Sequence, residues 1–277
     1  MGPVFDMSTI LYETFIIKHG YPYSGNYMFQ PKCIQLGLMA LIFFCMLISG
    51  SIAVSDMPDQ SIGGTSQDYQ TVSSGKSIDS NAFIDAGCFV DGYNLDCSNL
   101  GFDQRFGCIW ISNASAALGN LSPTLSLVEC LVRSEDYNFN SSEGIVREGC
   151  MMPMYRRFIA MQDGEFKQVR TKQEFQSVFA PVETKEEALS FAVALTSSFP
   201  KYDASTPESY FPVASPIEPT YVEETDGGFE VRLLDYEVCG CGTHPYYAID
   251  YSVTRDGNVT ELSRQKVYDS NSIICMD

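Results

Sequence analysis

Ten cysteines occur in the chain, and the eight that follow residue 54 constrain its fold more than any other feature. Five of these eight lie between residues 88 and 150, and three lie between residues 239 and 275. Because both counts are odd, complete pairing among these eight requires at least one disulfide that joins the two regions. Eight cysteines allow many pairings, so the connectivity stays open. The candidates are Cys88, Cys97, Cys108, Cys130, Cys150, Cys239, Cys241 and Cys275.

The uncharged apolar stretch at residues 34–54 decides the compartment in which these cysteines fold. A helix needs about 20 apolar residues to cross a bilayer. A signal peptide needs only about 7–15, followed by small residues at a cleavage site. Three interpretations stay open: a cleaved signal peptide, a retained single-span anchor and a soluble core helix. Either membrane interpretation places residues 55–277 outside the cytoplasm, where four disulfides are the default.

The residues around this stretch favour export. Ser51-Ile52-Ala53 fits a cleavage site, and the mature protein would then begin at Val54. Lys32 supplies a positive charge just before the apolar run. The preceding segment is long for a signal peptide, and a true start at Met28 would shorten it. Residues 1–27 are then expected to be absent from the native protein or disordered in it.

The negative charge of the exported part disfavours binding to nucleic acids and to anionic membranes. Residues 1–54 carry two acids and two bases, so the whole net charge of −18 falls on residues 55–277. Such a surface repels nucleic-acid backbones and anionic lipid headgroups. An acidic surface that keeps an exported protein soluble explains the charge most simply. No EF-hand run supports cation binding, and the sequence predicts neither a cofactor nor a metal site.

The chain divides into five expected segments. These are a leader or cytoplasmic segment at 1–33, the apolar stretch at 34–54, a flexible linker at 55–80, a cysteine-rich β and loop region at 81–150, and an α+β domain at 151–277. In the fourth segment we expect strands at Ala82–Val90, Cys108–Ile111 and Leu125–Val132. Four sequons predict surface loops open to N-glycosylation, and their occupancy stays open. Their asparagines are Asn113, Asn120, Asn140 and Asn258.

The last segment shows the clearest secondary-structure pattern. Asp163-Gly164 predicts a tight hairpin turn between strands at Met154–Met161 and Glu165–Val169. Capping-box spacing starts one helix after Thr171 and a second, more apolar one after Thr184. Strands are then expected at Thr220–Glu224, Phe229–Val238, Tyr246–Thr254 and Val259–Tyr268. The fold class predicted is α+β, with an antiparallel sheet packed by one main helix behind a disulfide-stapled, loop-rich β region and an N-terminal hydrophobic helix.

This order of elements at residues 184–268 resembles the PepSY and cystatin-like α+β modules of exported proteins. The resemblance rests on architecture and not on a diagnostic motif. It implies a binding or inhibitory module more than a catalyst.

The candidate catalytic side chains lie in one short run, Cys239-Gly-Cys241-Gly-Thr-His244-Pro245. His244 is the only histidine of the exported part, and a cysteine–histidine pair can act as nucleophile and base. Two glycines and a proline instead indicate a tight link between strands, in which the cysteines form structural disulfides and His244 bonds to a neighbouring strand. Because it precedes Pro245, His244 is expected to be extended.

Two functions follow from these patterns. The first is an exported or membrane-tethered, non-catalytic domain that binds a protein or an envelope component. The membrane contact, if residues 34–54 are uncleaved, would be that segment itself. The second is a thiol-disulfide or Cys–His enzyme centred on Cys239, Cys241 and His244. The sequence contains no phosphate-binding loop, nucleophile elbow or HExxH motif that would favour another enzyme class.

Overall fold

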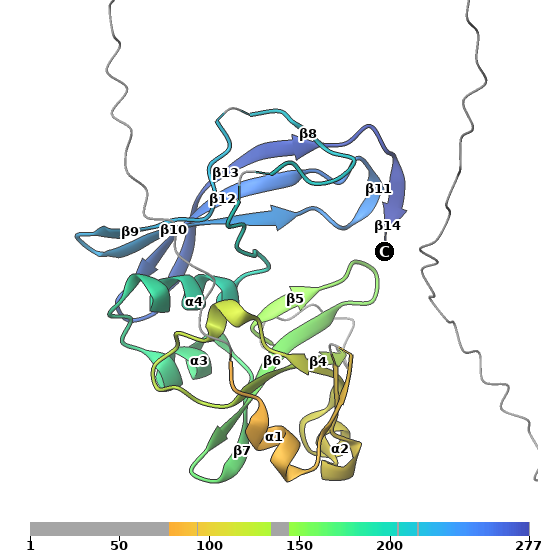
Figure 1. Ribbon diagram of the computed structural model, residues 1–277, viewed down its shortest axis with the longest axis vertical. Helices are drawn as coiled ribbons and strands as arrows, with labels where there is room; N and C mark the ends of the chain where they lie inside the picture. The colour runs from red at the N-terminus through yellow and green to blue at the C-terminus, as the bar shows by residue number, and fades with distance from the viewer. Residues whose placement is uncertain (1–77, 93, 134–143, 204, 215, 277) are drawn as a thin grey trace, which may run out of the picture. The chain divides into compact units, whose positions relative to one another are not determined.

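The computed structural model describes residues 78–276, apart from 93, 134–143, 204 and 215 (Figure 1). The leader, the apolar stretch at 34–54, nearly all of the linker and the sequon asparagine Asn140 lie outside the described residues. The described elements belong to one compact unit of the chain. Within them, no helix is long and apolar enough to cross a membrane.

The first sheet has seven strands in the order β1-β2-β3-β4-β6-β5, and β7 also pairs with β6. The strands are antiparallel: β1 (Phe89–Asp91), β2 (Asn94–Asp96), β3 (Cys108–Asn113), β4 (Leu127–Arg133), β5 (Val146–Glu148), β6 (Met154–Gln162) and β7 (Glu165–Val169). Because β4 pairs with β6 along its whole length, the boundary expected at residue 150 falls inside one sheet.

The strand expected at Ala82–Val90 is corrected by the structure. Asn81–Ala86 forms the helix α1, and the strand β1 begins only at Phe89. The Asp79 carboxylate accepts a hydrogen bond from the Asn81 N–H group at 2.8 Å, and Gly87 ends the helix with φ at 117°. These local helix signals outweigh the apolar run, which suggested a strand.

Two disulfides and a small core cover one face of this sheet. Cys88–Cys97 and Cys108–Cys130 lie in a buried cluster with aromatic and aliphatic side chains of α1, α2 (Phe102–Phe106) and the sheet. The short 3₁₀ helix η1 (Ser98–Leu100) connects β2 to α2, and η2 (Ala116–Leu118) follows β3. The rings of Phe83, Phe102 and Phe166 contact one another here.

Two helices follow at the positions that the capping patterns predict. In α3 (Lys172–Phe179), the Thr171 hydroxyl accepts the Glu174 N–H at 3.1 Å. In α4 (Lys185–Leu195), the Thr184 hydroxyl accepts the Glu187 N–H, and the Glu187 carboxylate accepts the Thr184 N–H, which completes a capping box.

The second sheet has five antiparallel strands in the order β8-β13-β12-β10-β9. Their bounds are β8 (Phe211–Pro212), β9 (Val222–Thr225), β10 (Gly228–Tyr236), β12 (Tyr246–Thr254) and β13 (Val259–Asp269). The helix α4 packs against β9, β10, β12 and β13, as expected for a main helix on an antiparallel sheet. A separate pair, β11 (Gly240–Gly242) with β14 (Ile274–Met276), holds the C-terminal segment.

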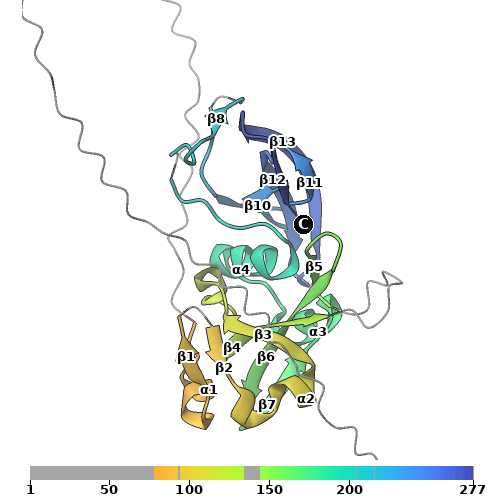
Figure 2. The ribbon, with the colours of Figure 1, turned by 90° about the vertical axis from the view of Figure 1, so that its right-hand side faces the viewer.

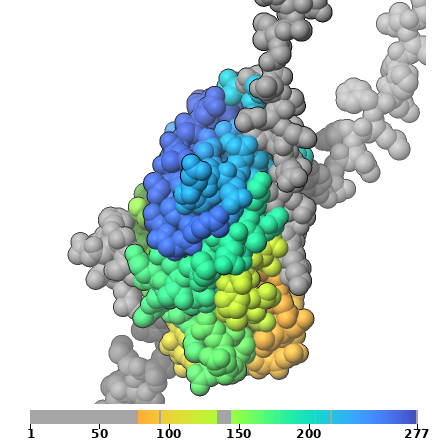
Figure 3. Space-filling view, turned by 90° about the vertical axis from the view of Figure 1, so that its left-hand side faces the viewer, coloured from red at the N-terminus to blue at the C-terminus, as the bar shows by residue number. Residues whose placement is uncertain are grey.

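One hydrophobic core connects both sheets through the two helices. It contains Phe158 of β6, Phe175 of α3, Phe191 of α4, Val231 of β10 and Ile249 of β12, all of them fully buried. Figure 3 shows the surface of α3 and α4, in green, directly against the blue surface of the second sheet. The described chain is therefore mostly β-sheet with few helices and four disulfides, which agrees with the coarse α+β prediction.

Candidate functional site

The CGCGTHP run lies where three segments that are distant in sequence meet. Cys239 follows β10 and bonds to Cys150, which follows β5, while Cys241 of β11 bonds to Cys275 of β14. We call these four cysteines the two-disulfide node. In both ribbon views the loop after β5 lies beside the C-terminal strand (Figures 1 and 2).

The node satisfies the requirement set by the odd cysteine counts. Cys150–Cys239 joins the two cysteine-containing regions across 89 residues of sequence. Cys241–Cys275 is a cross-strand disulfide, because these two residues face each other in the antiparallel pairing of β11 and β14. Cys239 and Cys241 are thus not bonded to each other. All eight described cysteines are in disulfides, which indicates an extracytoplasmic compartment.

His244 is buried beneath the node, with only 3% of its surface exposed. Its Nδ1 atom lies 2.7 Å from the Glu237 carbonyl oxygen, and its Nε2 atom lies 3.0 Å from the Ile274 carbonyl oxygen. The imidazole therefore links the end of β10 to the C-terminal strand. Because both nitrogens face carbonyl oxygens, neither is directed at a cysteine, and the geometry disfavours a Cys–His catalytic pair.

The backbone of His244 differs from the extended conformation expected before proline. Its φ is 47°, in the left-handed region that histidine adopts more readily than most residues. The Tyr210 hydroxyl lies 3.2 Å from both the His244 carbonyl oxygen and the Tyr236 hydroxyl. Burial raises the pKa of Tyr210 well above its usual range, so this phenol stays protonated. Contacts to neighbouring segments fix the turn at His244, and they override the preference of a residue before proline for an extended backbone.

Exposed apolar side chains flank the node. Each lies within two residues of a node cysteine in sequence, and we call them the apolar rim: Met151 (74% exposed), Met152 (75%), Val238 (39%), Ile273 (77%) and Ile274 (44%). Sequence reasoning missed this rim. The signal was present in the two methionines after Cys150 and in the two isoleucines before Cys275, of which the isoleucines follow a polar segment.

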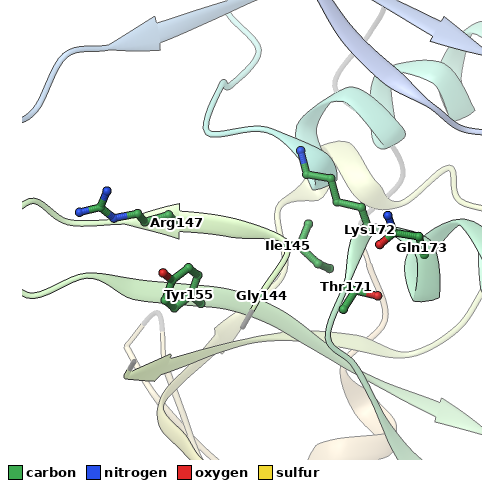
Figure 4. Close-up of a pocket in the computed structure, with 7 residues that line it drawn as sticks. All are labelled: Gly144, Ile145, Arg147, Tyr155, Thr171, Lys172 and Gln173. Carbon is green, nitrogen blue, oxygen red and sulfur yellow. The ribbon is translucent and has the colours of Figure 1, made fainter. Parts of the chain in front are cut away.

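A pocket of about 520 Å³ opens beside β5, β6 and the start of α3 (Figure 4). Gly144, Ile145, Arg147, Tyr155, Thr171, Lys172 and Gln173 line it. The amine of Lys172 and the guanidinium of Arg147 point in different directions in this view. Arg147 donates to the Cys150 carbonyl oxygen at 3.2 Å, toward the node. The pocket thus has two cationic side chains, and they do not point toward a common position where they could bind one anion.

The other predicted site residues are separate from the node. The sequon asparagines Asn113 and Asn258 are exposed, and Asn120 is half-buried. Asn258 lies in the turn between β12 and β13, where its amide donates to Thr260 of the same sequon at 3.4 Å. Within the described residues, no group of three or more histidine, cysteine or acidic side chains is placed to hold a metal ion.

Comparison with known proteins gives no relative for this chain. No protein-family model matches it, and no curated protein or solved structure shows significant similarity. The order of a helix followed by antiparallel strands, on which the PepSY and cystatin resemblance rests, is present from α4 to β13. The family itself stays a prediction.

Proposed function

We propose that this chain is an exported, disulfide-stabilised binding domain without catalytic activity, and that it binds a protein through the apolar rim. The observation that carries the proposal is the gathering of five exposed apolar side chains around two disulfides. Exposed apolar patches of this kind commonly mark protein interaction sites, and methionine side chains adapt to varied partners.

Charge narrows the class of partner. The net charge of −18 disfavours anionic membranes and nucleic acids, and it also disfavours a second copy of the same chain. Glu237 directly precedes Val238 of the rim and is exposed. A protein segment that presents both apolar and basic side chains complements such a surface. Whether the chain reaches this partner as a secreted protein or from a single N-terminal anchor depends on cleavage after Ala53.

A designed peptide pair tests the proposal directly. The probes are a fluorescent peptide of alternating leucine and lysine and its leucine and glutamate counterpart, with binding measured by fluorescence anisotropy. We expect the lysine peptide to bind. The double variant Met152→Asp/Ile273→Asp should weaken that binding about tenfold or more, because charges replace the apolar contacts.

The matched control places the same two charges elsewhere. Leu262 and Val213 are 56% and 46% exposed and lie outside the rim, so Leu262→Asp/Val213→Asp adds an identical charge change. This control should retain binding. Equal weakening in both double variants, or equal binding of the two peptides, would show that the rim is not the binding surface.

The alternative enzyme hypothesis has less support. Each cysteine of the CGC run bonds to a different partner, and both His244 nitrogens lie within 3.0 Å of carbonyl oxygens and not at a cysteine. The node retains one kind of chemistry, disulfide exchange, which needs no base.

A further inference from the structure

We propose that the two-disulfide node is a thiol-reactive site, at which a small monothiol forms a mixed disulfide with Cys275 and the two node disulfides rearrange into one Cys239–Cys241 bridge. This goes beyond the proposed binding function and does not depend on it.

Exposure separates the node from the other two disulfides. Cys239, Cys241 and Cys275 are exposed, and Cys150 is half-buried. By contrast, Cys88, Cys97, Cys108 and Cys130 are at most 5% exposed and lie in the small core of the first sheet. Disulfide exchange requires that a thiolate reach a sulfur atom, so a thiol in solution reaches the node first.

The spacing of Cys239 and Cys241 permits exchange between the two node disulfides. Residues two apart lie at most about 7 Å apart along an extended chain. Disulfides usually span Cα distances of about 4.4–6.8 Å. The residue between them is Gly240, whose φ of 90° lies in a region that glycine enters without strain. The thiolate of one cysteine therefore has the other within reach.

Cys150 is the leaving group of this exchange, because it is the partner of Cys239 in the disulfide that the Cys241 thiolate attacks. Cys275 is the favoured point of entry because it is exposed on the short C-terminal strand β14.

Each of the two exchange steps breaks one disulfide bond and forms another. The thiolate of the monothiol attacks the Cys275 sulfur, the Cys241–Cys275 bond breaks, and the electron pair leaves on Cys241. The Cys241 thiolate then attacks the Cys239 sulfur, and the Cys150–Cys239 bond breaks. The pair leaves on Cys150, which takes a proton from water. One thiol is consumed, and the number of disulfide bonds does not change.

This rearrangement would release the two segments that carry most of the apolar rim. Cys150 anchors the loop that holds Met151 and Met152, and Cys275 anchors the strand that holds Ile274. After exchange, neither loop nor strand is tied covalently to the end of β10. The thiol would thereby alter the surface around the node while the core of the first sheet keeps its disulfides.

Peptide mapping of the folded protein after exposure to millimolar glutathione tests the proposal. The reaction is quenched with acid, and free thiols are alkylated before digestion and mass spectrometry. We expect glutathione on Cys275, the alkyl label on Cys150, and one peptide with a Cys239–Cys241 bridge. The disulfides Cys88–Cys97 and Cys108–Cys130 should react at least about tenfold more slowly.

The double variant Cys150→Ser/Cys239→Ser separates exchange from simple attack. It retains Cys241–Cys275 but lacks the second step, so the Cys241 thiolate re-forms its original bond. Glutathione on Cys275 should then fall about tenfold or more. The proposal is overturned if the wild-type protein shows no Cys239–Cys241 bridge, or if the core disulfides react as fast as the node. Undiminished labelling of a folded variant would also overturn it.

Discussion

At the scale of single residues, His244 fixes the position of the C-terminal strand. Its ring contacts two carbonyl oxygens, at 2.7 and 3.0 Å, from segments that are far apart in sequence. We expect His244→Ala to lower the free energy of unfolding by about 0.5–1.5 kcal/mol, the usual cost of one lost hydrogen bond, since the single N–H of a neutral imidazole can donate to only one of the two carbonyl oxygens. Urea unfolding followed by circular dichroism measures this loss.

A second substitution separates the ring contacts from the backbone. His244→Asn keeps a residue that tolerates positive φ, so it should cost less than His244→Ala. The peptide binding proposed for the apolar rim needs no catalytic base, so both variants that fold should retain most of it. A variant with unchanged stability that loses a measurable turnover would instead support the Cys–His enzyme hypothesis.

Glu129 of β4 is a residue whose charge opposes folding. Burial raises the pKa of its carboxyl group above the ordinary value of 4.5, and the attraction of nearby Arg156 opposes this shift only in part. The folded state therefore binds this proton more tightly than the unfolded state. The stability that Glu129 contributes is fully present below pH 4.5 and is lost as the pH rises through the raised pKa.

Glu129→Gln removes this penalty while an amide oxygen still accepts the Ser115 N–H, which is bonded to the wild-type carboxylate at 3.3 Å. We expect the variant to be more stable than the wild type at about pH 7, with the difference shrinking toward about pH 4. Urea midpoints across that range measure the effect. A variant that is less stable at neutral pH would show that the attraction to Arg156 exceeds the cost of burial.

At the scale of elements, the hairpin of β12 and β13 fits closely against α4. A Cβ atom added at Gly257 would lie 2.4 Å from the ring of Phe191, and φ at this residue is 82°. Gly164, in the turn between β6 and β7, has a similar φ of 79° but nothing within 4 Å of such an atom. The two glycines thus differ in packing and not in backbone conformation.

These glycines form a matched pair of substitutions. Gly164→Ala should cost about 1 kcal/mol from backbone strain alone. Gly257→Ala should cost about 2–4 kcal/mol, because it adds a steric clash with a core ring to the same strain. Thermal and urea unfolding of both variants give the comparison. Equal losses would show that Phe191 moves aside without cost.

Local signals account for the elements that the sequence predicted well. Thr171 and Thr184 cap helices where their spacing indicates, and the Asp163-Gly164 turn lies between paired strands. Each of these features depends on residues within one turn. The helix α1 was missed because its apolar residues also suit a strand, and its N-cap Ser80 makes no side-chain capping bond.

At the scale of the whole molecule, long-range contacts determine the disulfide connectivity, which the sequence left open. The odd cysteine counts required a bridge between the two regions, but only the pairing of β11 with β14 selects Cys275 for Cys241 and leaves Cys239 for Cys150. The apolar rim exists for the same reason. Its members come from three separate segments, and no sequence pattern shows that these meet.

The bridge Cys150–Cys239 should stabilise both sheets together. Removing it with Cys150→Ala/Cys239→Ala is expected to cost about 2–5 kcal/mol, because it opens a long loop in the unfolded chain. Its sequence separation is 89 residues, against 9 for Cys88–Cys97. The chain-entropy argument therefore predicts a smaller loss for the matched variant Cys88→Ala/Cys97→Ala.

Unfolding of the bridge variant should still be a single transition, since one core connects the two sheets through α3 and α4. Two probes weight the two sheets differently. Trp110, the only tryptophan of the chain, lies in β3 of the first sheet, and the tyrosine cluster of Tyr236 and Tyr246 lies in the second. Tryptophan fluorescence and near-ultraviolet circular dichroism should give coincident urea midpoints. Separate midpoints would mean that the disulfide, and not the shared core, makes the two sheets unfold together.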